Sequence, residues 1–80
     1  MNKLRAMEVF IQVVDAGSFT RAADTLQMPK ATVSTLIAAL ESSLASKLLH
    51  RTTRHVSVTS DGAAYYERCV RILSDVRDAE

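Results

Sequence analysis

The sequence predicts a small, mainly α-helical domain that carries one β-hairpin, and three observations indicate this fold class. Between residues 18 and 44, two segments with helical spacing of apolar residues are separated by a short break. A basic segment with alternating β-branched residues follows at 50–58. Residues 60–80 then carry apolar side chains on more than one side of a long predicted helix.

Size and composition restrict the chain to one small domain. Its 80 residues are 48% hydrophobic and 24% charged, which is ordinary for a globular protein. A core this small leaves little stability, so association with a second copy would help. No apolar run approaches the roughly 20 residues of a membrane span, and no signal peptide is recognisable. Because the single cysteine, Cys69, excludes an intrachain disulfide, we expect a cytoplasmic protein.

Charge is distributed unevenly along the chain, although the net charge is only +1. Residues 18–58 carry five basic and two acidic side chains, an excess of three positive charges. Residues 59–80 carry three arginines and five acidic side chains, an excess of two negative charges. The central excess lies where phosphates would have to be neutralised if the partner were a nucleic acid. An ordinary mixture of solvated charges would explain the same distribution, so charge alone does not decide.

The first helix is expected over about residues 3–16. Asn2 is a suitable N-cap, and Gly17 suits the left-handed conformation that ends a helix. A buried stripe with spacings of three and four residues, widened by two further apolar positions, is expected from Leu4, Met7, Ile11, Val14, Phe10 and Val13.

Two further helices follow in close succession. Ser18 can cap a helix over about 19–26, and Gln27 and Met28 form the break after it. Pro29 is suited to the first turn of a third helix that runs to about residue 44. Two helices joined by such a short break are typical of proteins that place the second helix in the major groove of DNA. The expected buried stripe of this third helix is Val33, Ile37, Leu40 and Leu44.

The opposite face of the third helix is unusual. A helix that is merely solvated normally presents Glu and Lys to water, whereas this face is small and uncharged. A surface that fits closely against a partner explains this composition better. The residues on it are Ala31, Ser34, Thr35, Ala38 and Ser42.

A hairpin and a last helix complete the chain. Alternation at residues 56–58 predicts two short strands around a tip at about Thr52–Arg54. Thr59 or Ser60 can cap a helix that runs to the C-terminus. Its apolar residues cover more than one stripe, so one side can pack on its own domain and the other on a partner. These residues are Tyr65, Tyr66, Cys69, Val70, Ile72, Leu73 and Val76.

In spacing and identity the chain resembles the N-terminal DNA-binding domain of LysR-type transcriptional regulators over essentially all 80 positions. An RTTR segment followed by a strand and a Thr-x-x-Gly helix start is common in that family. The other matching positions are Phe10, Val13, Gly17, Ser18, Phe19, Ala22, Ala23, Leu26, Val33, Ser34, Ile37, Leu40, Glu41, Leu44, Leu48, Arg51, Thr59 and Gly62.

This resemblance implies a winged helix-turn-helix over residues 1–58, with the third helix reading the major groove. It also implies a linker helix over 59–80 that pairs two copies through Tyr66, Val70, Leu73 and Arg77. In the family this helix leads to an effector-binding domain. No such domain follows Glu80, so we expect a fragment that binds DNA as a homodimer and does not respond to a small-molecule effector.

The chain departs from the common family pattern at several positions of the third helix and beyond it. Relatives often have a Ser-Gln pair in place of Pro29-Lys30 and a Gly in place of Ala45. These differences leave the expected fold intact but prevent any transfer of base preference from relatives. The other departures are Thr35, Leu36, Ala38, Leu49 and Asp61.

Phosphate contacts orient a protein on DNA, whereas contacts to base edges specify the sequence. At the start of the second helix, Ser18, Thr20 and Arg21 suit a phosphate, and Ser18 can cap the helix at the same time. Lys30 suits guanine O6 or N7, with a phosphate contact as the alternative. Ala31 and Thr32 suit a thymine methyl group, Thr35 a base edge or a phosphate, and Ser34 a phosphate or a local backbone hydrogen bond.

The hairpin offers two arginines to DNA. We favour Arg54 for a narrow minor groove, whose negative potential is enhanced, and Arg51 for a phosphate, with the reverse assignment as the alternative. Thr52 and Thr53 add hydroxyl donors for the backbone.

Other function classes find less support. No acidic or thiol residue is spaced along the sequence so as to complete a metal or catalytic site with His50 or His55, and we expect neither a cofactor nor an enzyme. The rival function is a helical protein-interaction module without DNA binding, for which the last helix is the attractive part. The leading function is specific binding to double-stranded DNA with an inverted repeat.

Overall fold

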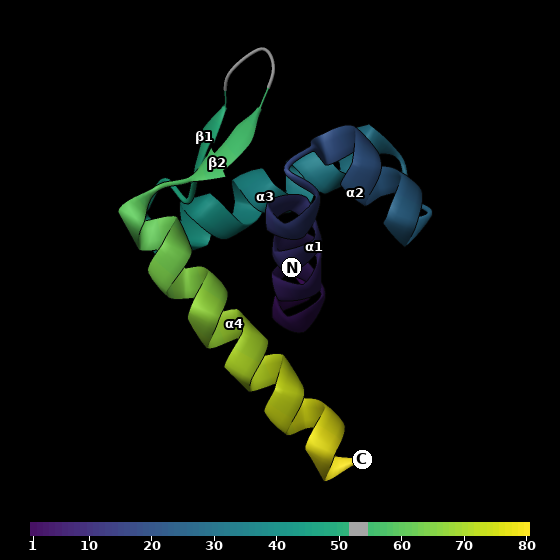
Figure 1. Ribbon diagram of the computed structural model, residues 1–80, viewed down its shortest axis with the longest axis vertical. Coiled ribbons are helices and arrows are strands. Elements are labelled where there is room, and N and C mark those ends of the chain that lie inside the picture. Colours follow the sequence, from purple (N-terminus) through teal and green to yellow (C-terminus); the bar gives the residue numbers. More distant parts are fainter. Residues whose placement is uncertain (52–54) are drawn as a thin grey trace.

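The computed structural model describes residues 1–51 and 55–80 and confirms a mainly helical domain with one hairpin (Figure 1). Among these residues, no helix is long and apolar enough to cross a membrane. The predicted tip, Thr52–Arg54, lies outside the described residues. The elements are α1 (Lys3–Ala16), α2 (Phe19–Leu26), α3 (Lys30–Leu44), β1 (Leu49–Arg51), β2 (Val56–Val58) and α4 (Ser60–Ala79).

Side-chain caps start three of the helices at the predicted positions. Asn2 Oδ1 accepts from the Arg5 amide at 3.1 Å, and Ser18 Oγ accepts from the Arg21 amide at 3.2 Å. Thr59 Oγ1 accepts from the Gly62 amide at 2.9 Å. Each cap satisfies one of the amides that the first helical turn leaves without an intrahelical acceptor, so the local sequence determines where these helices begin.

Helix α1 lies at the centre of the domain and contacts α2, α3, α4 and β2. The predicted stripe is only partly right, because Leu4 is 43% exposed and Ile11 and Val14 are half-buried. The buried face is instead centred one position away, because α2, α3, α4 and β2 all contact α1. Its buried residues are Ala6, Met7, Val9, Phe10 and Val13.

Helix α3 begins one residue later than predicted. Pro29 takes the N-cap position with φ −60° and ψ 143°, and its carbonyl accepts from the Thr32 and Val33 amides. An N-cap residue has extended backbone angles and does not use its own amide proton in the helix, so proline can occupy this position. The predicted stripe is buried at Val33, Ile37 and Leu40, and Leu44 is half-buried.

The two strands pair antiparallel, with Leu49 opposite Val58 and Arg51 opposite Val56. Leu49 is buried, whereas His50 and Arg51 on β1 are exposed. The Val56 amide donates to the Gly17 carbonyl at 3.4 Å, which connects the hairpin to the end of α1. The hairpin therefore stands on the domain core and extends away from it (Figure 1).

Helix α4 packs with one side on the core and extends to the C-terminus at the end opposite the hairpin (Figure 1). Gly62, Cys69 and Leu73 are buried, whereas Val70 is 43% and Val76 is 38% exposed. A Cβ atom at Gly62 would collide with the Leu48 carbonyl oxygen, so only glycine permits this close approach.

One buried polar atom lies inside this packing. The Tyr65 ring lies 5.7 Å from that of Phe10, and the Tyr65 hydroxyl has no hydrogen-bond partner of good geometry among the described residues. Burial, together with the adjacent Cys69 thiol, raises the pKa of Tyr65 to about 12. Burial likewise raises the pKa of the Cys69 thiol, which favours an inert thiol.

Replacing Tyr65 with Phe should stabilise the domain near neutral pH. The variant keeps the ring and removes an unsatisfied buried hydroxyl, which costs roughly 1–3 kcal/mol. In the wild type, the phenol ionises at about pH 10 in the unfolded chain and at about pH 12 in the folded one, so the free energy of unfolding falls as the pH rises from about 10 to 12. Urea unfolding across this range should show a smaller decline for the variant. An equal decline in both proteins would assign the effect to Tyr66, whose pKa is also raised.

Replacing Ala45 with Gly should also stabilise the domain. Ala45 ends α3 with φ +51°, a left-handed conformation that costs an L-residue roughly 1–2 kcal/mol. The more flexible unfolded glycine chain offsets roughly 0.4–1 kcal/mol of this gain, so a net increase of about 0.5–1 kcal/mol is expected by urea unfolding. Gly17→Ala is the matched control, because Gly17 has φ +65° and open space around its Cα. It should lower stability, and a loss of stability in both variants would contradict the backbone argument.

Candidate nucleic-acid interface

The outward face of α3 is exposed, as the sequence predicts. Lys30, Ala31, Thr32 and Thr35 are exposed, and Ser34 is half-buried. Lys30 makes no ion pair within residues 1–51 and 55–80, and its side chain is exposed. This face is small, polar and almost free of side-chain charge, and can therefore approach a flat or grooved partner closely.

Helix α2 packs against α3. Thr20 and Arg21, at the start of α2, are exposed. The Ser18 hydroxyl oxygen caps the helix, which still leaves its own proton for another acceptor. The structure thus brings together the predicted contact residues of α2 and α3 on two adjoining helices.

Arg51 joins these helices to the hairpin. Its guanidinium carbon lies 4.9 Å from the centre of the Phe19 ring, at the start of α2. One of its terminal nitrogens lies 3.5 Å from Glu41 Oε1, near the end of α3. The charged group predicted to contact a phosphate is therefore engaged within the domain, although 42% of the side chain remains exposed.

Glu41 holds the chain that enters the hairpin. Its Oε2 accepts from the Leu48 amide at 2.8 Å and the Leu49 amide at 3.3 Å. Its side chain is only 11% exposed. Sequence reasoning gave no role to Glu41 or Phe19. The position of Glu41 could have indicated its role, because an acidic side chain in the last turns of a helix interacts unfavourably with the helix macrodipole and therefore implies a stabilising partner elsewhere.

The remaining hairpin candidates are only partly described. Thr52, Thr53 and Arg54 lie outside the described residues. His50 and His55 are both exposed. No group of three His, Cys, Asp or Glu side chains suited to a metal ion occurs in the described part of the chain.

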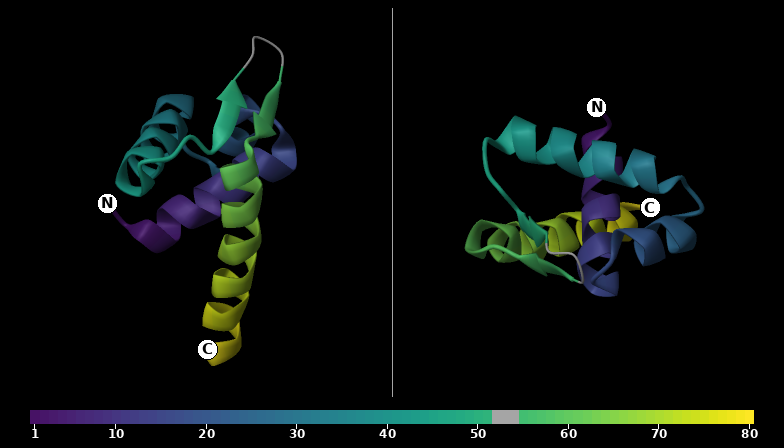
Figure 2. Two further views of the ribbon diagram at one scale, coloured as in Figure 1. Left: turned by 90° about the vertical axis from the view of Figure 1, so that its left-hand side faces the viewer. Right: turned by 90° about the horizontal axis from the view of Figure 1, so that it is seen from above.

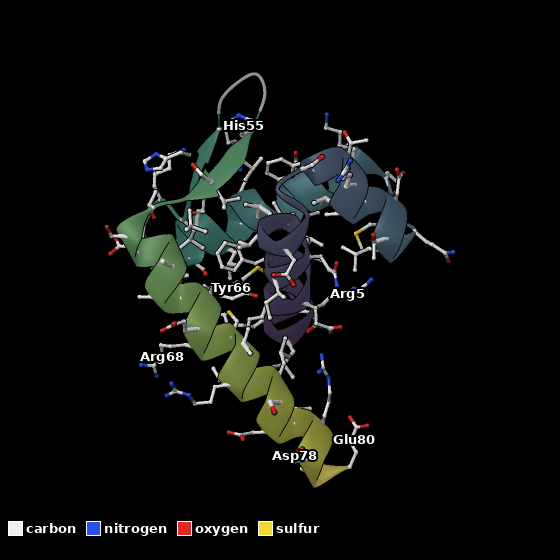
Figure 3. All side chains as sticks on the ribbon, in the orientation of Figure 1. Arg5, His55, Tyr66, Arg68, Asp78 and Glu80 are labelled. Atoms are coloured by element: carbon white, nitrogen blue, oxygen red, sulfur yellow. The ribbon has the colours of Figure 1, made fainter. Side chains whose placement is uncertain are left out.

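The residues predicted to pair two copies do not share one environment. The Tyr66 hydroxyl donates to Asp15 Oδ1 at 2.6 Å, and this bond raises the pKa of Tyr66. Figure 3 shows Tyr66 between α4 and α1, whereas Arg68 points away from α1. Leu73 is 8% exposed and belongs to the core, the alternative that the sequence left open for this stripe. Val70 and Arg77 are exposed.

The exposed α3 face and the hairpin lie at one end of the molecule, away from the distal half of α4 (Figure 1 and Figure 2). The hairpin lies at one end, and α4 carries the C-terminus to the other (Figure 2). Helices α2 and α3 lie beside the hairpin end (Figure 1). A ligand on the α3 face would therefore leave the distal half of α4 free.

Comparison with known proteins supports this geometry. The family model for bacterial regulatory helix-turn-helix proteins of the lysR family matches residues 4–63. An HTH-type transcriptional repressor of Pseudomonas aeruginosa is 52% identical over 80 residues, which cover all of this chain and 25% of that protein. The HTH-type transcriptional activator AaeR of Escherichia coli is 45% identical over 78 residues, covering 98% of this chain and 25% of AaeR. The chain thus spans about a quarter of the length of these curated relatives.

Solved structures have the same fold. The BenM DNA-binding domain in complex with catB site 1 DNA has a TM-score of 0.92 and 37% identity, covering 95% of this chain and 84% of that one. The CbnR DNA-binding domain in complex with DNA has a TM-score of 0.93 and 32% identity, covering 95% of this chain and 87% of that one. These matches confirm the winged helix-turn-helix fold. The chain belongs to the LysR family of bacterial regulatory helix-turn-helix proteins.

Proposed function

We propose that this chain is the DNA-binding domain of a bacterial transcription regulator and recognises a specific double-stranded operator. The observation that carries the proposal is the exposed face of α3, whose small side chains suit the major groove. The family match and two structural neighbours solved with DNA support it. The relatives are named as transcription regulators, which favours this function over an enzyme.

The proposed DNA contacts fall into base contacts and phosphate contacts. Lys30 contacts guanine O6 or N7, and Ala31 and Thr32 contact thymine methyl groups. Thr35 meets a base edge or a phosphate. The residues that meet phosphates are Ser18, Thr20, Arg21 and Ser34. From sequence alone, we assign Thr52 and Thr53 to the DNA backbone and Arg54 to the minor groove.

Residues 59–80 are proposed to serve as the linker that pairs two copies. Val70 and Val76 are exposed apolar side chains on α4, and Val70 lines a hollow with Tyr66, Arg71 and Ser74. Two copies related by two-fold symmetry would match an inverted repeat. We place the protein in the bacterial cytoplasm. A small-molecule effector would act through a further domain of the kind that relatives in this family carry.

Binding-site selection from a random duplex library tests this function directly. The wild type should recover an inverted repeat, and log K should fall linearly with log salt concentration, by about 0.9 per neutralised phosphate. Absent or salt-independent binding to duplex DNA would exclude the proposal. Self-association without DNA binding would favour the protein-interaction module instead.

Replacing Lys30 with Ala should relax the preference at one base pair of each half-site. The expected loss on the selected duplex is roughly 1–3 kcal/mol, because one base-edge contact disappears. Lys3→Ala removes the same charge at the far end of α1 and serves as the control. If Lys30→Ala weakens all duplexes equally, Lys30 contacts a phosphate.

Replacing Val70 with Glu should separate the dimer without unfolding the domain, because Val70 is 43% exposed. Analytical ultracentrifugation should show a monomer, and circular dichroism an unchanged helix content. Affinity for the two-site duplex should fall by about 10²-fold or more as avidity is lost. The control is Ala64→Glu, which adds the same charge at another exposed position of α4. A dimer that persists in Val70→Glu would exclude this face from pairing.

A further inference from the structure

Three DNA-facing elements meet at one small group of side chains. Glu41 comes from α3, Arg51 from β1 and Phe19 from the start of α2. The Arg51 guanidinium lies against both of the others, 3.5 Å from the carboxylate and 4.9 Å from the ring centre. No role in DNA binding follows from the motifs for Glu41 or Phe19, and the structure suggests one.

Glu41 has an unfavourable position that its partners must offset. Its carboxylate is nearly buried and lies near the negative end of the α3 dipole. It is compensated by two backbone amides and one guanidinium, all from residues 48–51. Hydrogen bonds to a charged group are stronger than neutral ones, so this carboxylate fixes where the hairpin leaves the core.

Arg51 extends this connection to α2. A guanidinium can pair its edge with a carboxylate and stack its face on an aromatic ring at the same time, which an ammonium cannot. Phe19 is the first residue of α2 and adjoins Thr20, a proposed phosphate contact. The base of the hairpin is thereby held to the end of α3 and to the beginning of α2.

We propose that Glu41, Arg51 and Phe19 form a positioning cluster that sets the hairpin against α3, so that both engage one DNA site together. The proposal rests on the DNA-binding function proposed above. It gives Arg51 a role other than phosphate contact, because its positive charge is compensated by Glu41 within the domain. It also makes a nearly buried acidic residue, Glu41, necessary for binding a polyanion.

The direction in which Glu41→Gln changes DNA affinity distinguishes the two possible roles of Arg51. If Arg51 contacts a phosphate, Glu41→Gln removes a competing negative charge, and affinity should stay the same or rise. If the cluster positions the hairpin, Glu41→Gln should lower affinity for the duplex selected by the wild type, by about tenfold for a lost charged hydrogen bond. Asp24→Asn, which neutralises an exposed carboxylate on α2, is the control and should not weaken binding.

A footprint distinguishes positioning from general stability. With saturating protein that is folded by circular dichroism, hydroxyl-radical cleavage should show wild-type protection at the α3 site and at the flanking minor groove. Glu41→Gln should keep the protection at the α3 site and lose the protection at the flanking minor groove. Phe19→Leu, which leaves the ion pair intact, should show the same change with a loss of about threefold. If Glu41→Gln does not fold, the footprint of Phe19→Leu tests the positioning role instead.

The outcomes separate the two proposals. Unchanged or tighter binding by Glu41→Gln, or weaker binding with the full wild-type footprint, would overturn the positioning role and leave the DNA-binding function standing. A wild type that shows no salt-dependent binding to duplex DNA would remove the DNA-binding function, and the positioning role with it.

Discussion

Burial of one face of α1 is the constraint on which the rest of the structure depends. This helix contacts the other three helices and β2, and Val9, Phe10 and Val13 on it are fully buried. Side chains in a closely packed interior cannot shift independently. The orientation of α3, the direction of α4 and the base of the hairpin are therefore set relative to the same central helix. The outward face of α3 stays exposed because Val33, Ile37 and Leu40 on its opposite face pack into this core.

Hydrogen bonds from polar side chains form a second set of contacts, which connect the elements at the edge of that core. Hydrophobic burial is non-directional, so it leaves the angle of a short hairpin poorly defined. Here, directional hydrogen bonds define the angle of the hairpin. Glu41 binds two amides at the hairpin base, and Thr59 Oγ1 donates to the Lys47 carbonyl at 2.7 Å. Ser46 Oγ donates to Asp61 Oδ2 at 2.8 Å, which joins the end of α3 to the start of α4.

Much of the fold was predictable because its signals are local. The caps Asn2, Ser18 and Thr59 and the left-handed Gly17 act within a few residues, and the observed helix ends agree with them. The errors arose where a distant neighbour decides. Leu4 has helical spacing but no element covers it, and Ile11 and Val14 on the same predicted stripe are only half-buried. Periodicity identifies a face and says nothing of which neighbour covers it.

The sequence by itself determined the class of the domain, the limits of its helices and the small outward face of α3, since each of these depends on spacing along one chain. It also carried the family resemblance. Tertiary structure alone decided how those elements work together. Residues 19, 41 and 51 are far apart in the chain and belong to three elements, and only folding brings their ring, carboxylate and guanidinium into contact. Their interaction depends on distance in space, which a linear pattern does not encode.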